Sequence, residues 1–179
     1  VPVSRSTGVD ISDLQAVQHC LQEIKQRHGK IDYVVNTAAV LSRQPLANMD
    51  YAEVCSAVGI NYTGAVNVAL GSFEYLCESK GQLLNFTSSS YTYGRALYSL
   101  YSSAKAAVVN LTQALAEEWH PEGIRVNCIN PERTDTPMRK RAFGVEPSNT
   151  LLNSKEVATH SLAVLLSKTT GQIVDVRKR

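Results

Sequence analysis

Residues 88–105 read Ser-Ser-Ser-Tyr-Thr-Tyr-Gly-Arg-Ala-Leu-Tyr-Ser-Leu-Tyr-Ser-Ser-Ala-Lys and place Tyr101 four positions before Lys105. Residues at i and i+4 share one face of a helix, so the lysine ammonium is expected beside the phenol. A nearby cation favours the phenolate and lowers the tyrosine pKa from its usual value of about 10, as acid–base chemistry near neutral pH requires. Ser88, at the end of a predicted strand, could hydrogen-bond the group whose proton moves. The same spacing arises by chance in many helices, so other motifs in the chain have to show whether Tyr101 and Lys105 belong to a catalytic site.

The composition is that of an ordinary globular protein, with 44% hydrophobic and 19% charged residues in a chain of 179. The net charge of +2 gives no reason to expect a nucleic acid or an acidic membrane as partner. No uninterrupted apolar run approaches the ~18 residues of a membrane span, and no secretory signal is recognisable. The cysteines and histidines show no ligand-like spacing, which indicates free thiols in a reducing cytoplasm and no metal site.

Strand and helix patterns alternate along the chain, which predicts one α/β domain over residues 1–179. Nearly continuous apolar runs are typical of parallel strands that are covered on both faces, so we expect a doubly wound, Rossmann-like sheet. Strands are expected at 1–4, 31–35, 83–87, 124–129 and 173–176. Helices are expected from the cap Ser12 to Gly29, from the cap Asp50 to Lys80 with a bend at 59–61, from the Tyr101 segment to Pro121, and from the cap Ser154 onward.

Polar clusters follow three of these strands and are expected on one rim of the sheet, where open α/β sheets bind their ligands. The order and spacing of these clusters and of the Ser88, Tyr101 and Lys105 residues resemble those of the short-chain dehydrogenase/reductase family over nearly the whole chain. The residues that carry the resemblance are Asp10-Ile11, Asn36-Thr37-Ala38-Ala39, Asn61 in Gly-Ile-Asn-Tyr-Thr-Gly, Ser88, Tyr101, Lys105, and Asn130-Pro131 through Thr136.

The resemblance implies a hydride transfer between a nicotinamide cofactor and a carbonyl substrate. It implies that Tyr101 is the general acid, that Ser88 polarises the carbonyl, that Lys105 lowers the tyrosine pKa and holds the ribose, and that Asn61 links a proton relay to solvent. Arg5 follows the first expected strand and suits a 2′-phosphate, which favours NADP(H) over NAD(H). The residues implied in cofactor binding are Arg5, Asp10, Ile11, Asn36, Ala38, Tyr101, Lys105, Pro131, Thr134 and Thr136.

The chain departs from the family pattern at its beginning and after Pro131. It contains no Gly-x-x-x-Gly-x-Gly phosphate loop, and the family's first strand and first helix have no counterpart, so we expect an N-terminally truncated domain that binds cofactor weakly. Glu132 stands where the family has glycine. Arg133 beside it, together with 139–141, suggests either a charged polyol phosphate as substrate or simply a solvated basic segment. Tyr91, Arg95 and Arg133 are the candidate substrate residues.

The Asn-Pro-Glu-Arg-Thr segment and the Ile-Val-Asp-Val-Arg ending are most similar to the reductase domains of bacterial bifunctional proteins that make CDP-ribitol for capsule or wall polysaccharides. That similarity implies NADPH-dependent reduction of ribulose 5-phosphate, with a cytidylyltransferase domain upstream. A reductase of another keto substrate, such as a ketoacyl group or a sugar derivative, and a non-catalytic dimerisation module remain as alternatives. The family also implies a homodimer or homotetramer formed through the helices that carry Asn61 and Lys105.

Overall fold

The structure is a computed structural model that describes residues 8–178. The predicted strand at 1–4 and the predicted cofactor residue Arg5 lie outside this range. The four strands within the described range are β1 Tyr33–Asn36, β2 Gln82–Phe86, β3 Arg125–Pro131 and β4 Ile173–Val176. The helices are α1 Leu14–His28, α2 Tyr51–Val58, the π-helix η3 Gly59–Thr63, α3 Gly64–Ser79, α4 Ser99–Glu118, α5 Pro137–Phe143 and α6 Ser154–Leu166, with short 3₁₀ turns η2 Leu46–Asn48, η4 Ser89–Tyr91, η5 His120–Glu122 and η6 Ser148–Thr150.

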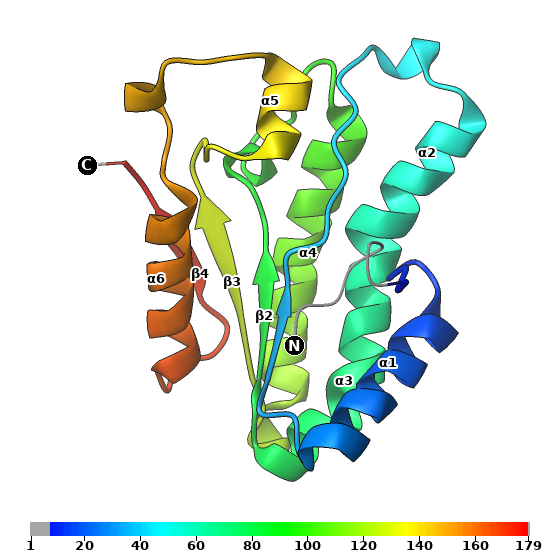
Figure 1. The fold of residues 1–179 in the computed structure, drawn as a ribbon, viewed down its shortest axis with the longest axis vertical. Helices are drawn as coiled ribbons and strands as arrows, with labels where there is room; N and C mark the ends of the chain where they lie inside the picture. Colours follow the sequence, from blue (N-terminus) through cyan, green and yellow to red (C-terminus); the bar gives the residue numbers. More distant parts are fainter. Residues whose placement is uncertain (1–7, 179) are drawn as a thin grey trace.

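The sheet is wholly parallel and its strands follow the chain in the order β1-β2-β3-β4. Helices α3 and α4 cover one face with α1 packed outside α3, and α6 covers the other face beside β3 and β4 (Figure 1). Because side chains alternate along a strand, β2 serves both layers. Leu83 packs in the core under α1, α3 and α4, and Leu84 packs in the core under α6. The predicted doubly wound α/β class is therefore confirmed.

The predicted helix ends are mostly correct, with two shifts of one residue. Asp50 caps α2 by accepting the backbone N–H of Glu53, as predicted. The cap of α1 is Asp13 rather than Ser12, and that of α6 is Asn153 rather than Ser154. In both places two cap-forming residues stand side by side, and the sequence does not show which of them has the extended backbone that a cap needs.

The long helix over 51–79 is interrupted where the sequence predicted a bend. Residues 59–63 form a π-turn, which adds one residue to the helical turn without ending the helix. This helix is the one segment among residues 8–178 long and apolar enough to cross a membrane, yet half of its most apolar window is buried inside the fold. Its packing against α1 and the sheet identifies it as a core helix.

Helix α5 was not predicted, because residues 138–153 show little apolar periodicity. It begins with Pro137 at its first position after the cap Thr136, whose hydroxyl accepts the backbone N–H of Arg139. A Thr-Pro pair is a recognised start of a helix, so a signal was present. The helix lies above the carboxyl ends of β2 and β3 (Figure 1).

Candidate active site

A cavity of about 770 Å³ opens at the carboxyl ends of the strands, below α5. Its walls come from the loop after β1, from the segment after β2, from α4, from the turn after β3, and from α5 and α6. Ser88, Tyr101 and Lys105, which are far apart in the sequence, all line it. The cavity therefore brings together three of the four predicted catalytic residues.

Ser88 and Tyr101 both line the cavity, and the Ser88 hydroxyl is near enough to lower the pKa of the Tyr101 phenol. Ser88 directly follows the buried strand β2 in extended conformation, and its hydroxyl also accepts from the backbone N–H and the hydroxyl of Ser90, at 3.4 and 3.2 Å. Tyr101 lies in the first turn of α4, which brings its phenol to the end of β2. Strand and helix together thus hold two hydroxyl groups side by side on the cavity wall.

Lys105 lies one turn further along α4 and is only 3% exposed. Its ammonium donates a hydrogen bond of 2.8 Å to the Phe86 carbonyl and lies 5.7 Å from the centre of the Tyr101 ring. Burial lowers the lysine pKa to about 8, and the nearby Cys128 thiol acts in the opposite direction. Burial likewise raises the pKa of Cys128 to about 12, so this thiol is neutral packing beneath the site.

The pKa of Tyr101 is raised, whereas the sequence predicted that Lys105 would lower it. Burial of the phenol is the main cause and disfavours the phenolate; the Ser88 hydroxyl acts against it, and Tyr98 adds to the rise. The i, i+4 spacing does place Lys105 beside Tyr101, but the ammonium points to the backbone carbonyl of Phe86. Tyr101 is consequently a protonated donor across the neutral range, which suits an acid in carbonyl reduction.

Asn61 lies in the π-turn, is 2% exposed and binds the loop after β1 with both ends of its amide. Its Nδ2 donates to the Val40 carbonyl at 2.9 Å, and its Oδ1 accepts the Val40 N–H at 3.0 Å. The neighbours of Val40, Ala39 and Leu41, line the cavity, although Asn61 itself does not. In this arrangement Asn61 positions the loop that forms one wall.

Replacing Asn61 by leucine is expected to lower the free energy of unfolding by about 2–3 kcal/mol, since two hydrogen bonds are lost and the partly buried Val40 amide is left without partners. Urea denaturation measures this change. Asn110→Leu, on the exposed surface of α4, is the matched control and should change stability by less than about 0.5 kcal/mol. An equal loss in both variants would contradict a specific role of the Val40 contact.

The residues predicted to bind cofactor divide into two groups. Tyr101, Lys105, Pro131, Thr134 and Thr136 line the cavity. The threonine hydroxyls also have local partners: that of Thr134 donates to the Glu132 carbonyl at 2.8 Å, and that of Thr136 caps α5.

Four other predicted residues lie outside the cavity wall. The Asp10 carboxylate accepts from Ser12, and the Ile11 carbonyl accepts from the Asn67 side chain. Asn36 accepts the backbone N–H of Ala38 at 3.2 Å, which shapes the turn after β1. Their predicted contact with the adenine end of a cofactor stays a prediction.

The donor set in the cavity fits the nicotinamide end of a dinucleotide. An ammonium and hydroxyl groups line a cavity large enough for a ring and its ribose, and Lys105, Thr134 and Thr136 would hold them. The printed sequence offers no glycine-rich loop for the pyrophosphate. The residues present therefore fit the reactive half of NAD(P)H.

Of the three predicted substrate residues, Arg95 and Arg133 line the cavity and Tyr91 does not. Glu132, the departure from the family glycine, also borders the cavity, but its carboxylate accepts the backbone N–H of Lys178 at 3.1 Å. Lys178 in turn donates to the Leu151 carbonyl at 3.1 Å. Glu132 therefore holds the chain after β4 to the turn after β3, and Lys178 holds it to the segment that follows α5.

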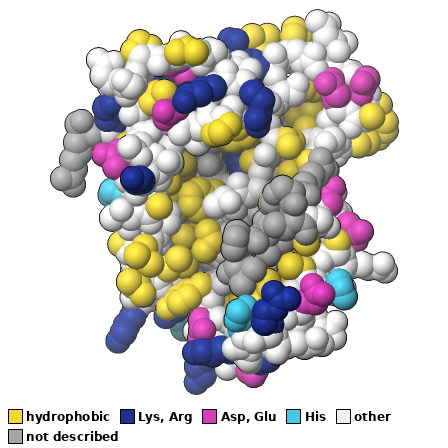
Figure 2. Space-filling view, viewed as in Figure 1, with side chains coloured by type: hydrophobic (Ala, Val, Ile, Leu, Met, Phe, Trp, Pro, Cys, Tyr) yellow, Lys and Arg dark blue, Asp and Glu magenta, His cyan; other side chains and the backbone are white. Residues whose placement is uncertain are grey.

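Sequence reasoning missed an aromatic row that joins α5 to the reactive tyrosine. The Tyr98 ring meets Tyr101 edge-on at 6.4 Å and Phe143 at 5.8 Å between ring centres. Arg139 and Arg43 lie over Phe143, at 4.5 and 5.1 Å. The basic residues at 139–141 marked this segment in the sequence, but its packing on the site is a tertiary contact that no spacing shows. Figure 2 shows Lys and Arg side chains gathered at this end of the molecule.

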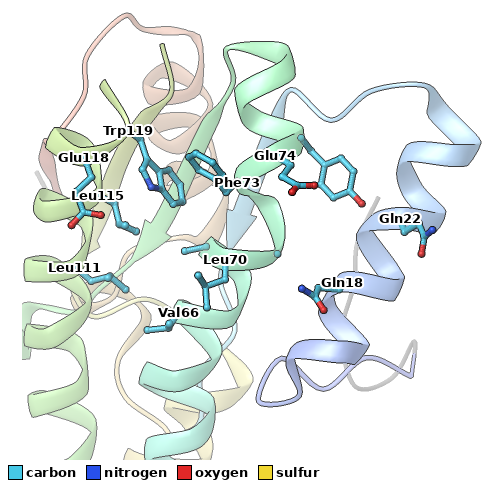
Figure 3. A pocket seen from close by; sticks show the side chains of 13 residues that line it. Gln18, Gln22, Val66, Leu70, Phe73, Glu74, Leu111, Leu115, Glu118 and Trp119 are labelled. Carbon is cyan, nitrogen blue, oxygen red and sulfur yellow. The ribbon is translucent and has the colours of Figure 1, made fainter. Parts of the chain in front are cut away.

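A second hollow of about 570 Å³ lies on the helical face, away from the reactive groups. Gln18 and Gln22 of α1, Leu70 and Phe73 of α3, and Trp119 at the end of α4 border it (Figure 3). Phe73 and Trp119 pack at 5.2 Å between ring centres. The hollow offers amide and carboxylate groups but no nucleophile beside a base, so we place the reaction in the cavity below α5.

Two relatives illustrate what this chain is similar to. It is 53% identical over 174 residues to the bifunctional ribulose 5-phosphate reductase/CDP-ribitol pyrophosphorylase of Haemophilus influenzae, covering 97% of this chain and 37% of that protein. It is 26% identical to the 3-oxoacyl-[acyl-carrier-protein] reductase of Thermotoga maritima, covering 74% of this chain and 54% of that protein. The chain thus spans little more than half, or less, of these curated relatives.

Solved structures match the fold closely. A 3-ketoacyl-(acyl-carrier-protein) reductase from Brucella melitensis complexed with NADH superposes with a TM-score of 0.86 at 25% identity, covering 94% of this chain and 74% of that one. A gluconate 5-dehydrogenase from Burkholderia cenocepacia with NADP and tartrate gives 0.84 at 23% identity, covering 93% and 71%. The family model described as short chain dehydrogenase matches residues 5–146, and the chain belongs to this family of oxidoreductases.

Proposed function

We propose that this chain is the reductase part of an enzyme that reduces ribulose 5-phosphate to ribitol 5-phosphate with NADPH. The observation that carries the proposal is a cavity in which Ser88 and Tyr101 lie beside buried Lys105 and which arginines also line. The ribitol assignment draws on the relative that is 53% identical over nearly the whole chain. The product would serve the synthesis of CDP-ribitol.

Each residue of the site has a defined part in the reaction. NADPH, when bound, supplies the hydride to the carbonyl carbon. Ser88 donates a hydrogen bond to the carbonyl oxygen and polarises the C=O bond. Tyr101 gives its phenolic proton to that oxygen as the alkoxide forms, and the positive charge of Lys105 stabilises the phenolate left behind. Asn61 keeps the loop after β1 in place through Val40, and its predicted part in a proton relay stays a prediction.

An assay on the complete gene product tests the proposal. We expect NADPH oxidation, followed by absorbance, to depend on ribulose 5-phosphate, with NADPH preferred to NADH because of the Arg5 guanidinium. An acetoacetyl thioester and a keto sugar without phosphate serve as rival substrates. Turnover of a rival but not of ribulose 5-phosphate would refute the ribitol assignment and favour the alternative reductase reading.

We also propose that the protein self-associates as a homodimer or homotetramer through α3 and α4. Leu70 is 59% exposed on the outer face of α3, beside the hollow of Figure 3. Light scattering on the complete gene product gives the mass. By analogy with the bifunctional relative, we place a cytidylyltransferase domain upstream in the same polypeptide and the whole in the cytoplasm, where its four unpaired cysteines stay reduced.

A further inference from the structure

The cavity below α5 has two chemically different ends. Ser88, Tyr101 and Lys105 form the reactive end. Three arginines, Arg95, Arg133 and Arg139, line other parts of the wall. They come from three separate segments, namely the loop between η4 and α4, the turn after β3, and α5. The cavity thus carries more positive charge than the chemistry of carbonyl reduction needs.

One of these arginines is already neutralised. Arg139 donates to both carboxylate oxygens of Glu146, from Nε at 2.6 Å and from Nη2 at 2.9 Å, and both side chains are about four-fifths buried. This bidentate hydrogen bonding is the main reason that the pKa of Glu146 is lowered. The Arg139 guanidinium also lies over the Phe143 ring. Arg139 is therefore a fixed structural element of α5 with little capacity for a ligand.

The guanidinium groups of the other two arginines, Arg95 and Arg133, are free to bind a ligand. Within residues 8–178, neither Arg95 nor Arg133 forms an ion pair or donates a side-chain hydrogen bond. Arg95 lies 5.6 Å from the centre of the Tyr93 ring, which leaves the edge of its guanidinium open. Arg133 is close enough to Glu146 for its charge to lower the pKa of that carboxyl group. The hydrogen bonds to Glu146, however, come from Arg139. Glu132 is the one carboxylate that the described residues contribute to the cavity wall, and it accepts the backbone N–H of Lys178.

We propose that Arg95 and Arg133 form an anion subsite that binds the phosphate group of the substrate, while the Arg139–Glu146 pair supports the wall behind Arg133. The proposal rests on the proposed function, since it assumes that the reactive end reduces the carbonyl of the same molecule. Two guanidinium groups match the charge of a phosphate dianion, and each can donate two parallel hydrogen bonds to phosphate oxygens. The subsite makes phosphorylated ketoses the preferred substrate class over neutral ones.

The test compares Arg95→Gln, Arg133→Gln and the double variant with wild type in the complete gene product. For ribulose 5-phosphate, we expect each single variant to lower kcat/KM by about 10- to 100-fold, because a charge-assisted hydrogen bond is lost. For ribulose, which has no phosphate, kcat/KM should stay within about twofold. Arg141→Gln, an exposed residue of α5 outside the cavity wall, is the matched control and should change neither value.

Equal losses with both ketoses, or no loss with either, would overturn the subsite. A selective loss in Arg139→Gln without one in Arg95→Gln or Arg133→Gln would also overturn it. Calorimetry with ribitol 5-phosphate and ribitol gives a readout that needs no turnover: wild type should bind the phosphorylated polyol more tightly, and the double variant should not. If wild type discriminates in binding but never oxidises NADPH, the proposed reaction fails while the subsite stands.

Discussion

Tyr101→Phe is expected to lower kcat for carbonyl reduction about a thousandfold, which is within the range that a positioned general acid contributes. The change removes only the phenolic oxygen, which lies on the cavity wall with Ser88. The ring stays in place and keeps its edge-on contact with Tyr98. Steady-state kinetics on the complete gene product, with the reaction partners of the assay above, measures the loss.

Folding and acid chemistry are separable in this variant. Loss of one phenolic hydroxyl should change the free energy of unfolding by no more than about 1 kcal/mol, so the protein should remain folded by circular dichroism. Tyr51→Phe, at the first position of α2 with the side chain 81% exposed, is the matched control and should keep full activity. If Tyr101→Phe retained more than about a tenth of the wild-type kcat, another group would have to be the acid.

Lys105→Met is expected to change how stability depends on pH. The folded-state pKa of Lys105 is about 8, below its ordinary value of 10.5. Between these values the unfolded chain binds more protons, so the contribution of Lys105 to stability increases as pH rises and is least favourable below about pH 8. Wild type should therefore gain roughly 3 kcal/mol relative to the methionine variant across this window. Urea denaturation at about pH 7.5 and about pH 10.5 measures the difference.

The same substitution should affect turnover, because the phenolate left on Tyr101 loses its neighbouring charge. In wild type, kcat/KM for reduction should fall above about pH 8, where Lys105 loses its proton while Tyr101 is still protonated. Lys168→Met, at an exposed position, is the control for both experiments. If the free energy of unfolding changed by the same amount between the two pH values in wild type and in Lys105→Met, the lowered pKa of buried Lys105 would be contradicted.

Much of the fold could be predicted, because the signals that define it are local. Apolar runs located the four described strands, and the poor helix formers at 59–61 marked the π-turn. Helix α5 was missed because it is short and not amphipathic in the usual way. Its stability comes from contacts such as that of Phe143 with Tyr98, which only the folded chain brings together. Elements that a local pattern defines could thus be predicted from the sequence, whereas an element that depends on tertiary packing could not.

The site divides in the same way. Spacing along α4 and the position after β2 were enough to bring Ser88, Tyr101 and Lys105 together. The direction of the Tyr101 pKa was wrong, because a sequence displays a neighbouring charge but not how much water a fold removes around the phenol. The role of Arg139 was also invisible, since its partner Glu146 lies seven residues away, across a turn that no periodicity predicted.

The π-turn at 59–63 has a consequence for how this helix tolerates length changes. Each residue of an α-helix turns the chain by about 100°, and a π-turn accommodates one residue more than an α-turn does. Deleting one residue before Asn61 could leave an unbroken helix, yet everything on one side of the deletion would rotate by about that angle. Either the Asn61 amide would leave Val40 or the core face of α3 would leave the sheet. A single surplus residue therefore sets the rotation between Asn61, which holds the loop after β1, and the half of the helix that packs in the core.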